Sequence, residues 1–170
     1  WHTPHAGWRG SYGFTVSGWH DRVQLNVIQY MNTQTEDGRI KNFPNRDSRY
    51  NMGEVLVDQL LYDWLWTGDL DFMRQGGYDF IANHLKHQDA YLKVPEIDLY
   101  ENWLNAWNTD NKWHNGGASI ISSSYTWRAY QVMADIASRL GKDDEARFYA
   151  TKAELIRTAA AEQLWSQEKG

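Results

Sequence analysis

Apolar residues recur with a helical period along most of the chain, and no useful stretch alternates between apolar and polar positions as a half-buried strand would. The segment Glu54–Trp66 (EVLVDQLLYDWLW) is apolar almost all the way round, which predicts a helix that is buried on most sides. Residues 119–140 and 143–165 each carry apolar residues on one stripe, which predicts two further helices. We therefore expect an all-α fold.

Glycine-centred turns join these helices in pairs. Gly68 directly precedes Asp69, and Gly141 lies two residues before Asp143, so each turn is expected to end one helix and cap the next. The first turn leads into a helix predicted over 70–92, which two central glycines weaken. An earlier helix is predicted over 18–35, with Ser17 as its N-cap. The remaining polar or glycine-rich stretches predict loops at 1–17, 35–52 and 93–118.

Length and charge narrow the range of partners. The chain has 170 residues, enough for one domain with a hydrophobic core. Its net charge is −5 and its Lys and Arg residues are scattered, so no basic patch exists to bind nucleic acid or an anionic membrane. No apolar run approaches the ~20 residues of a membrane span.

Cysteine is absent, which excludes disulfides and thiolate metal sites. The first residue, Trp1, leads us to expect a segment of a longer protein.

Aromatic residues are abundant, with ten Trp and ten Tyr, although the mean hydropathy is only −0.72. The stretch Leu99–Gly117 (LYENWLNAWNTDNKWHNGG) combines two acids with three tryptophans, five asparagines and a histidine, in a predicted loop. Indoles cover the apolar face of a pyranose ring, amides bond to its hydroxyl groups, and a carboxyl group can protonate a glycosidic oxygen. The stretch therefore indicates a sugar site.

Three acids are candidates for the chemistry. Glu101 is the first choice as general acid, because neighbouring rings would shield it and partial burial raises a carboxyl pKa; the alternative is an acid at a helix start or in an ion pair. Asp110 is either a second carboxylate or the cap of a turn. Asp21 either complements the dipole at the start of its helix or forms one wall of a cleft with Trp8 and Arg9.

No metal or other cofactor is expected. The histidines considered as a metal set, which lack the spacing of a metal-binding motif, are His2, His5, His20 and His114. Asn108–Asn111 has part of the pattern of a calcium loop, but the other oxygen ligands are missing. Ser122–Ser124 has no GxSxG elbow, so a serine hydrolase is not indicated.

Several sequence blocks together resemble one group of proteins. The blocks are WRGSY at 8–12, GWHDR at 18–22, YE at 100–101 with WxxD at 107–110 and HNGG at 114–117, SYxxRA at 124–129, and AxxLGKD at 137–143. In this order they resemble the six-hairpin glycosidase-like proteins, most closely a poorly characterised group from bacterial polysaccharide-degradation systems. More distant relatives of that architecture are α-L-rhamnosidases, glucoamylases and trehalases. The resemblance runs over essentially the whole chain.

The resemblance implies a toroid of six helical hairpins, (α/α)6, with the active site at one end where the long loops gather. Residues 1–170 would form the N-terminal part of that catalytic domain, the remainder of which belongs to the same longer chain. Glu101 matches the position of one catalytic carboxylate of the family, and the second would lie after Gly170. The resemblance also implies a periplasmic or secreted protein.

On this basis we expect a glycoside hydrolase that acts on polysaccharide-derived oligosaccharides. Glu101 would donate the proton, while Asp110 and Asp21 would orient substrate or water. The side chains expected to bind the oligosaccharide or polysaccharide substrate are Trp8, Arg9, Trp19, His20, Arg22, Trp103, Trp107, His114 and Asn115. Whether cleavage is inverting or retaining stays open.

Two alternatives also stay open. A polysaccharide lyase on the same toroid would use Tyr, His, Asn and Arg side chains on uronic acids, so Tyr100, His114 and Asn115 would matter more. Stacked helical hairpins also form non-catalytic repeat scaffolds that bind peptides or glycans. Long loops rich in Trp and Asn, and a spacing between hairpin turns longer than the common 34-residue repeat, argue against the scaffold.

Overall fold

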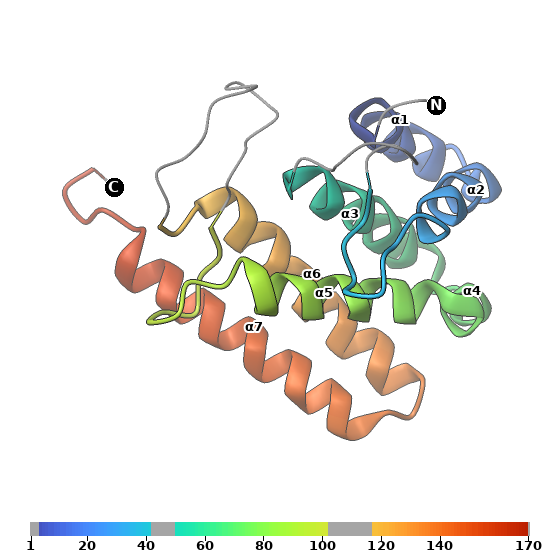
Figure 1. The fold of residues 1–170 in the computed structure, drawn as a ribbon. Helices are drawn as coiled ribbons and strands as arrows, with labels where there is room; N and C mark the ends of the chain where they lie inside the picture. The colour runs from blue at the N-terminus through green and yellow to red at the C-terminus, as the bar shows by residue number, and fades with distance from the viewer. Residues whose placement is uncertain (1–3, 42–49, 102–116, 170) are drawn as a thin grey trace.

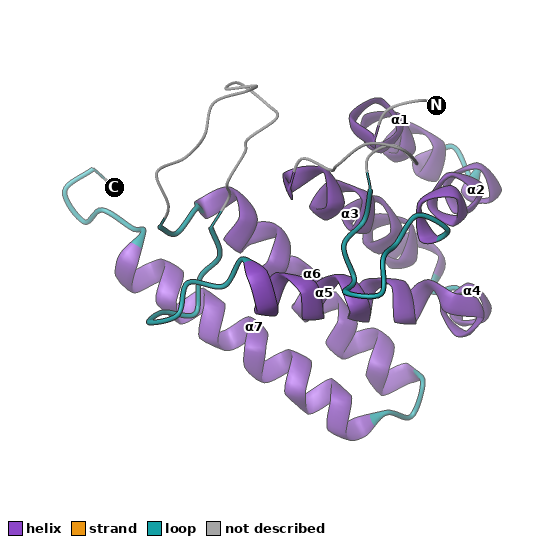
Figure 2. Cartoon of the chain, in the orientation of Figure 1, coloured by secondary structure: helices purple, strands orange, loops and turns teal. Residues whose placement is uncertain are grey.

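The computed structural model describes residues 4–41, 50–101 and 117–169, and in these ranges the chain is all-α, as predicted (Figure 2). The elements are α1 (Pro4–Val16), α2 (His20–Met31), α3 (Tyr50–Thr67), α4 (Leu70–Phe72), the π-helix η1 (Met73–Gly77), α5 (Tyr78–Tyr91), α6 (Ile120–Arg139) and α7 (Asp143–Gln163). The described loops contain isolated β-bridges but no strand. None of the helices in these ranges is long and apolar enough to cross a membrane.

Three helical hairpins, α1–α2, α3–α5 and α6–α7, follow one another along the chain (Figure 1). Helix α3 packs against both α1 and α6, and α2 and α5 each pack against the first helix of the next hairpin as well as that of their own. The second helices α5 and α7 are joined by an ion pair in which Lys152 Nζ lies 2.8 Å from Asp89 Oδ2. The hairpins are therefore stacked side by side.

Polar contacts show that α1, α3 and α6 run parallel. The contacts are Trp8–Asp58 and Thr15–Asp63 between α1 and α3, and Asp58–Arg128 and Trp64–Asp135 between α3 and α6. In each pair of helices the residue numbers rise together on both partners. The N-terminal ends of α3 and α6 therefore lie at one end of the stack, and the short turns within the hairpins lie at the other.

Most predicted helices are confirmed with small changes of boundary. The helix predicted over Glu54–Trp66 is α3, and those predicted over 119–140 and 143–165 are α6 and α7. The predicted weakness in 70–92 is real, because Gly76 has a φ of +128° and the chain passes through η1 before α5 begins. Glycine tolerates this backbone conformation, which L side chains rarely adopt.

The prediction for the N-terminal region is wrong. Residues 1–17 were expected to form a loop, whereas α1 occupies Pro4–Val16 despite its glycines. Packing of α1 against α3 supplies the stability that local propensity lacks: Ser11 and Thr15 are buried on this face. Ser17 does not cap the next helix, which begins at His20 with Trp19 in the N-cap position and no side-chain capping bond.

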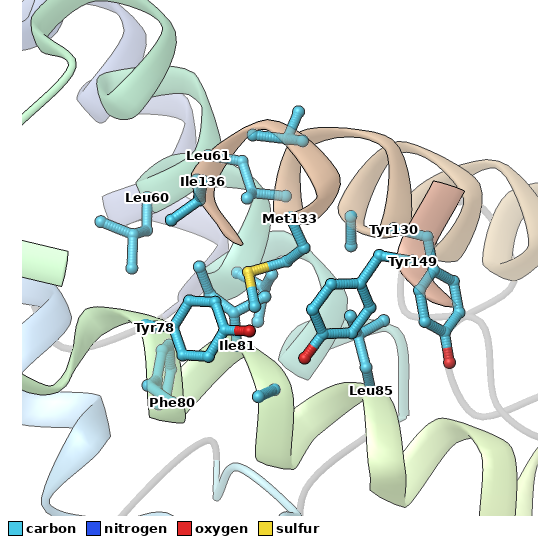
Figure 3. Packing of buried hydrophobic residues seen from close by; sticks show 14 of the residues in the cluster. Leu60, Leu61, Tyr78, Phe80, Ile81, Leu85, Tyr130, Met133, Ile136 and Tyr149 are labelled. Atoms are coloured by element: carbon cyan, nitrogen blue, oxygen red, sulfur yellow. The ribbon is translucent and has the colours of Figure 1, made fainter. Parts of the chain in front are cut away.

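The hydrophobic core lies where α3, α5 and α6 meet, with α7 behind it. Figure 3 shows Met133 of α6 pointing toward Tyr78 and Ile81 of α5, and all three are buried. Leu60 and Leu61 of α3 close the same cluster. This core fixes the positions of α3 and α6 relative to each other. The polar contacts between the two helices are therefore held at constant positions along their length.

Gly38 provides a test of the close packing between the 33–41 loop and α5. Its φ is +86°, and an added Cβ would lie 2.0 Å from the Asn83 carbonyl oxygen. We expect Gly38→Ala to lower the free energy of unfolding by about 2 kcal/mol or more, because backbone strain and a clash add together. Gly141→Ala is the matched control, since Gly141 has a φ of +74° but nothing within 4 Å of the added Cβ. Equal losses in urea denaturation would contradict the predicted clash.

Candidate functional site

The carboxylate of Asp58, on α3, joins the three parallel helices. The Trp8 indole donates from Nε1 to Oδ2 over 3.0 Å, and the Tyr12 hydroxyl donates to the same oxygen over 2.5 Å. From α6, Arg128 Nε lies 3.1 Å from Asp58 Oδ1 in an ion pair. Asp58 is buried, with 2% of its surface exposed, so these partners balance a charge that has little access to water.

Further side chains surround this ion pair. Tyr125, half-buried on α6, is close enough to Asp58 that burial, followed by the negative charges of Asp58 and Glu54, raises its pKa to about 12. The exposed guanidinium of Arg9 lies 5.7 Å from the centroid of the Trp8 ring. We use "the Asp58 surface" for the set Trp8, Arg9, Tyr12, Asp58, Tyr125 and Arg128.

A buried polar cluster lies one turn earlier on α3 than Asp58, nearer the N-terminal end of that helix. The Gln88 amide donates from Nε2 to Glu54 Oε1 over 3.1 Å, and the same nitrogen lies 3.2 Å from His84 Nε2. Burial raises the pKa of Glu54 to about 7, while Ser122 and Gln88 act against that rise. Burial lowers the pKa of His84 to about 3, so the imidazole is neutral at physiological pH.

Glu54 makes stability depend on pH. Its folded pKa of about 7 exceeds its ordinary value of 4.5, so its contribution to stability is complete below pH 4.5 and is lost as pH rises through 7. Relative to Glu54→Gln, the wild-type protein should lose about 3 kcal/mol between pH 4.5 and pH 8. The opposite effect of His84 is present in both proteins and cancels in the difference. Urea denaturation at several pH values measures that difference, and parallel pH profiles would contradict the assignment.

Glu101 lies at the N-terminal end of α6. Its backbone N–H donates to the Leu92 carbonyl oxygen over 2.8 Å, and it forms an isolated antiparallel bridge with Ala118. Ala118 directly precedes Ser119, whose hydroxyl accepts from the Ile121 N–H and caps α6. Glu101 is half-buried. The predicted general acid is thus held at the end of the stack where α3 and α6 begin, whereas Asp58 and Arg128 lie midway along these helices.

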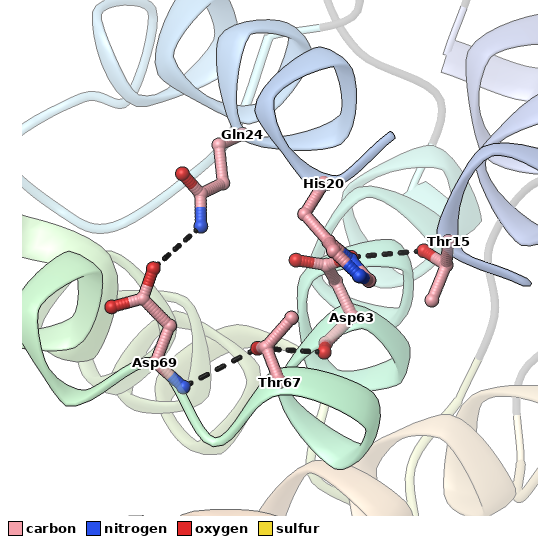
Figure 4. A network of polar contacts seen from close by, with 6 residues as sticks. All are labelled: Thr15, His20, Gln24, Asp63, Thr67 and Asp69. Carbon is pink, nitrogen blue, oxygen red and sulfur yellow. Dashed lines mark hydrogen bonds and ion pairs between the residues drawn. The ribbon is translucent and has the colours of Figure 1, made fainter. Parts of the chain in front are cut away.

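The GWHDR block lies toward the other end of the stack. His20 Nδ1 is 2.7 Å from Asp63 Oδ1, and the Thr15 hydroxyl donates to that oxygen over 3.0 Å (Figure 4). Close by, Gln24 donates from Nε2 to Asp69 Oδ2 over 2.8 Å, at the turn after α3 (Figure 4). His20 is therefore part of the contact between two hairpin turns.

The rise per residue of the parallel helices gives the distance along the stack between Glu101 and the GWHDR block. Arg128 and Asp58 pair with each other and therefore lie at the same height in the stack. At ~1.5 Å per residue, this height is about 12 Å from the start of α6 in one direction and about 8 Å from Asp63 in the other. Glu101 and the GWHDR block are therefore about 20 Å apart along the stack. The structure does not bring Glu101 and Asp21 into one cleft, because they flank opposite ends of parallel helices.

The predicted site residues thus fall into three groups. Trp8 and Arg9 belong to the Asp58 surface, which lies midway along the stack. The residues at the far end are Trp19, His20, Asp21 and Arg22. Asp21 lies in the first turn of α2, where its negative charge complements the helix dipole, as one of its two interpretations predicts. Those that lie outside the described residues are Trp103, Trp107, Asp110, His114 and Asn115.

Glu54 and Asp58 were not among the functional residues predicted from the sequence. Both are acids within a helix that is otherwise apolar nearly all round, and both are 2% exposed. A buried acid requires polar partners, so this pattern was the available signal, although the partners on α1, α5 and α6 could not be identified from it.

Tyr100 does not have the access that a lyase base requires. It is 1% exposed, and its hydroxyl donates to Asp89 Oδ1 over 2.5 Å. Within the described ranges no three His, Asp or Glu side chains are grouped as metal ligands. Comparison of the chain with protein-family models, with curated proteins and with solved structures finds no match.

Proposed function

We propose that the chain is part of an (α/α)6 glycoside hydrolase that acts on polysaccharide-derived oligosaccharides, with Glu101 as the proton donor. One observation carries the proposal: Glu101 lies at one end of three parallel helices, and the Asp58 surface lies about 12 Å further along the same helices. That surface combines aromatic rings with guanidinium groups over a buried carboxylate, which suits a ligand with flat apolar faces and many hydroxyl groups.

The residues divide into two roles. Both oxygens of Asp58 lie against donors from α1 and α6, so Asp58 orients the Trp8 indole and the Arg128 guanidinium rather than reacting with substrate. The side chain of Arg9 is exposed, so hydroxyl or carboxylate groups of a sugar can reach it. Glu101 would protonate the glycosidic oxygen as the bond to it breaks, while a second carboxylate activates water or attacks the sugar.

The arrangement of the hairpins supports a toroid. The first helices lie side by side and parallel, and the second helices α2 and α5 also contact the next hairpin, as in a closed ring of hairpins. Leu65 and Trp66, at the end of α3, remain 58% and 57% exposed. Further hairpins of the same domain would cover such residues, so the proposal includes a longer chain that completes the ring and supplies the second carboxylate.

The proposal is tested by incubating the full-length protein with neutral and uronic oligosaccharides and analysing the products. Release of reducing ends without a new C=C absorbance is the expected result. Products that absorb because of a new C=C bond would identify a lyase and contradict the proposal. Quenching of Trp fluorescence by a glycan without any product would identify a binding module instead. The burial of Tyr100 supports the hydrolase over the lyase.

A further inference from the structure

A groove of about 560 Å³ lies over the α1–α2 hairpin, far from Glu101. Phe14 and Trp19 form its aromatic part. Arg22, Asn26 and Gln29 recur at intervals of four and three residues, so they line it from one face of α2. The groove therefore combines an aromatic platform with amide and charged groups, and it belongs to the part of the chain that the proposed active site leaves unused.

Trp19 presents an open aromatic surface. Its ring is stacked on Phe14, with centroids 5.5 Å apart and an angle of 27° between the planes. Despite this contact, 56% of the Trp19 surface is exposed. Phe14 supports one face of the indole, and the exposed area leaves the other face accessible. A rigid, exposed indole face is what the apolar face of a pyranose ring requires for stacking.

Asn26 supplies an unused hydrogen-bonding group in the same groove. It is 9% exposed, and its amide donates from Nδ2 to Gln59 Oε1 over 3.1 Å. This hydrogen bond to α3 fixes the orientation of the Asn26 side chain. Its carbonyl oxygen has no hydrogen-bond partner among the described residues. A buried acceptor without a donor is costly, and a ligand hydroxyl group would satisfy it after a small movement of the side chain.

The rim of the groove is polar and nearly neutral. The carboxylate of Asp21 and the guanidinium of Arg22 are 74% and 68% exposed, with Arg22 Nε 3.9 Å from Asp21 Oδ2. An exposed pair at this distance is weak and easily exchanged for ligand hydroxyl groups. Because the two charges cancel, the rim favours a neutral ligand over an anionic one.

We propose that this groove is a second carbohydrate-binding site, in which Trp19 stacks on a neutral pyranose unit while Asn26 and Gln29 bond to its hydroxyl groups. The site lies about 20 Å from Glu101 along the stack, so it would hold a distant part of the polysaccharide or a second chain. It binds without reacting, and its test therefore does not depend on hydrolysis by the proposed active site.

The test compares variants of the full-length protein by isothermal titration calorimetry with cellohexaose, xylohexaose and maltohexaose. All variants carry Glu101→Gln, so that turnover does not deplete the probe. Trp19→Ala should weaken binding of at least one probe about tenfold or abolish one of two binding phases. Gln29→Ala should weaken the same phase about threefold. Trp165→Ala is the control, because Trp165 is 59% exposed and lies outside the groove.

Either of two results would overturn the second site: Trp19→Ala binds every probe as tightly as the Trp165→Ala control, or none of the three probes binds at all. Failure of the proposed hydrolase would instead appear as absent turnover with intact binding at Trp19, so the two failures are distinguishable.

Discussion

Replacement of Glu101 by Gln in the full-length protein should lower hydrolysis of the active oligosaccharide by about 10²–10⁴-fold. The amide keeps the size and the hydrogen-bonding capacity of the side chain but cannot transfer a proton to the leaving oxygen. The loss should appear in kcat, while the dissociation constant for substrate stays within about threefold of that of the wild type. Reducing-sugar release measures the first quantity, and quenching of Trp fluorescence measures the second.

The control for this experiment is Glu96→Gln. Glu96 is exposed and lies five residues before Glu101 in the same connecting segment. The Glu96→Gln variant should retain the turnover rate of the wild type. A Glu101→Gln enzyme that hydrolyses substrate at nearly the wild-type rate would rule out Glu101 as the proton donor, even if the glycoside hydrolase activity itself were demonstrated.

Replacement of Asp58 by Ala should lower the free energy of unfolding by about 3 kcal/mol or more. The substitution removes the acceptor of the Trp8 indole and the Tyr12 hydroxyl and leaves the Arg128 guanidinium, 35% exposed, without its carboxylate. Because Asp58 joins α1, α3 and α6, the loss should also loosen the packing of three helices. Urea denaturation of the full-length protein, followed by Trp fluorescence, measures the change.

Asp135 offers a matched control on the surface. It accepts from the Trp64 indole over 3.3 Å and lies 2.9 Å from Arg139 Nε, so its partners are of the same types, but its side chain is 45% exposed. Asp135→Ala should cost about 0–1 kcal/mol, because water replaces the lost partners. If both variants lose the same stability, burial is not the reason for the importance of Asp58.

Local patterns were sufficient where a helix buries one continuous stripe. The stripe that contains Met133 and Ile136 predicted α6, and the stripe that contains Tyr149, Ala153 and Ile156 predicted α7; all of these residues are buried. The same reasoning failed for α1. That helix contains several glycines, and its stability comes from contacts with α3 that no local pattern contains.

The positions of the candidate site residues also depended on tertiary contacts that no local pattern contains. The sequence predicted that Trp8 and Arg9 are functional and placed them in one cleft with Asp21, because the blocks are neighbours in the chain. In the structure, Trp8 and Arg9 lie on helix α1, and Asp21 follows the turn after that helix, so the rest of α1 carries the two blocks about 10 Å apart along the stack. This separation follows only once the segment that holds Trp8 and Arg9 is known to be helical.

By itself, then, the sequence determined the all-α class, the hairpin turns, and the concentration of acids, amides and aromatic rings that suggests a sugar ligand. These properties depend on residues within one or two helical turns of one another, and their period is visible along the chain. Only the tertiary structure decided that Asp58 connects α1 with α6, that Glu54 is buried beside His84, and that Trp19 faces a groove away from Glu101. Those relations depend on which faces of distant helices meet, because the partners of a buried charge are chosen by packing rather than by position in the sequence.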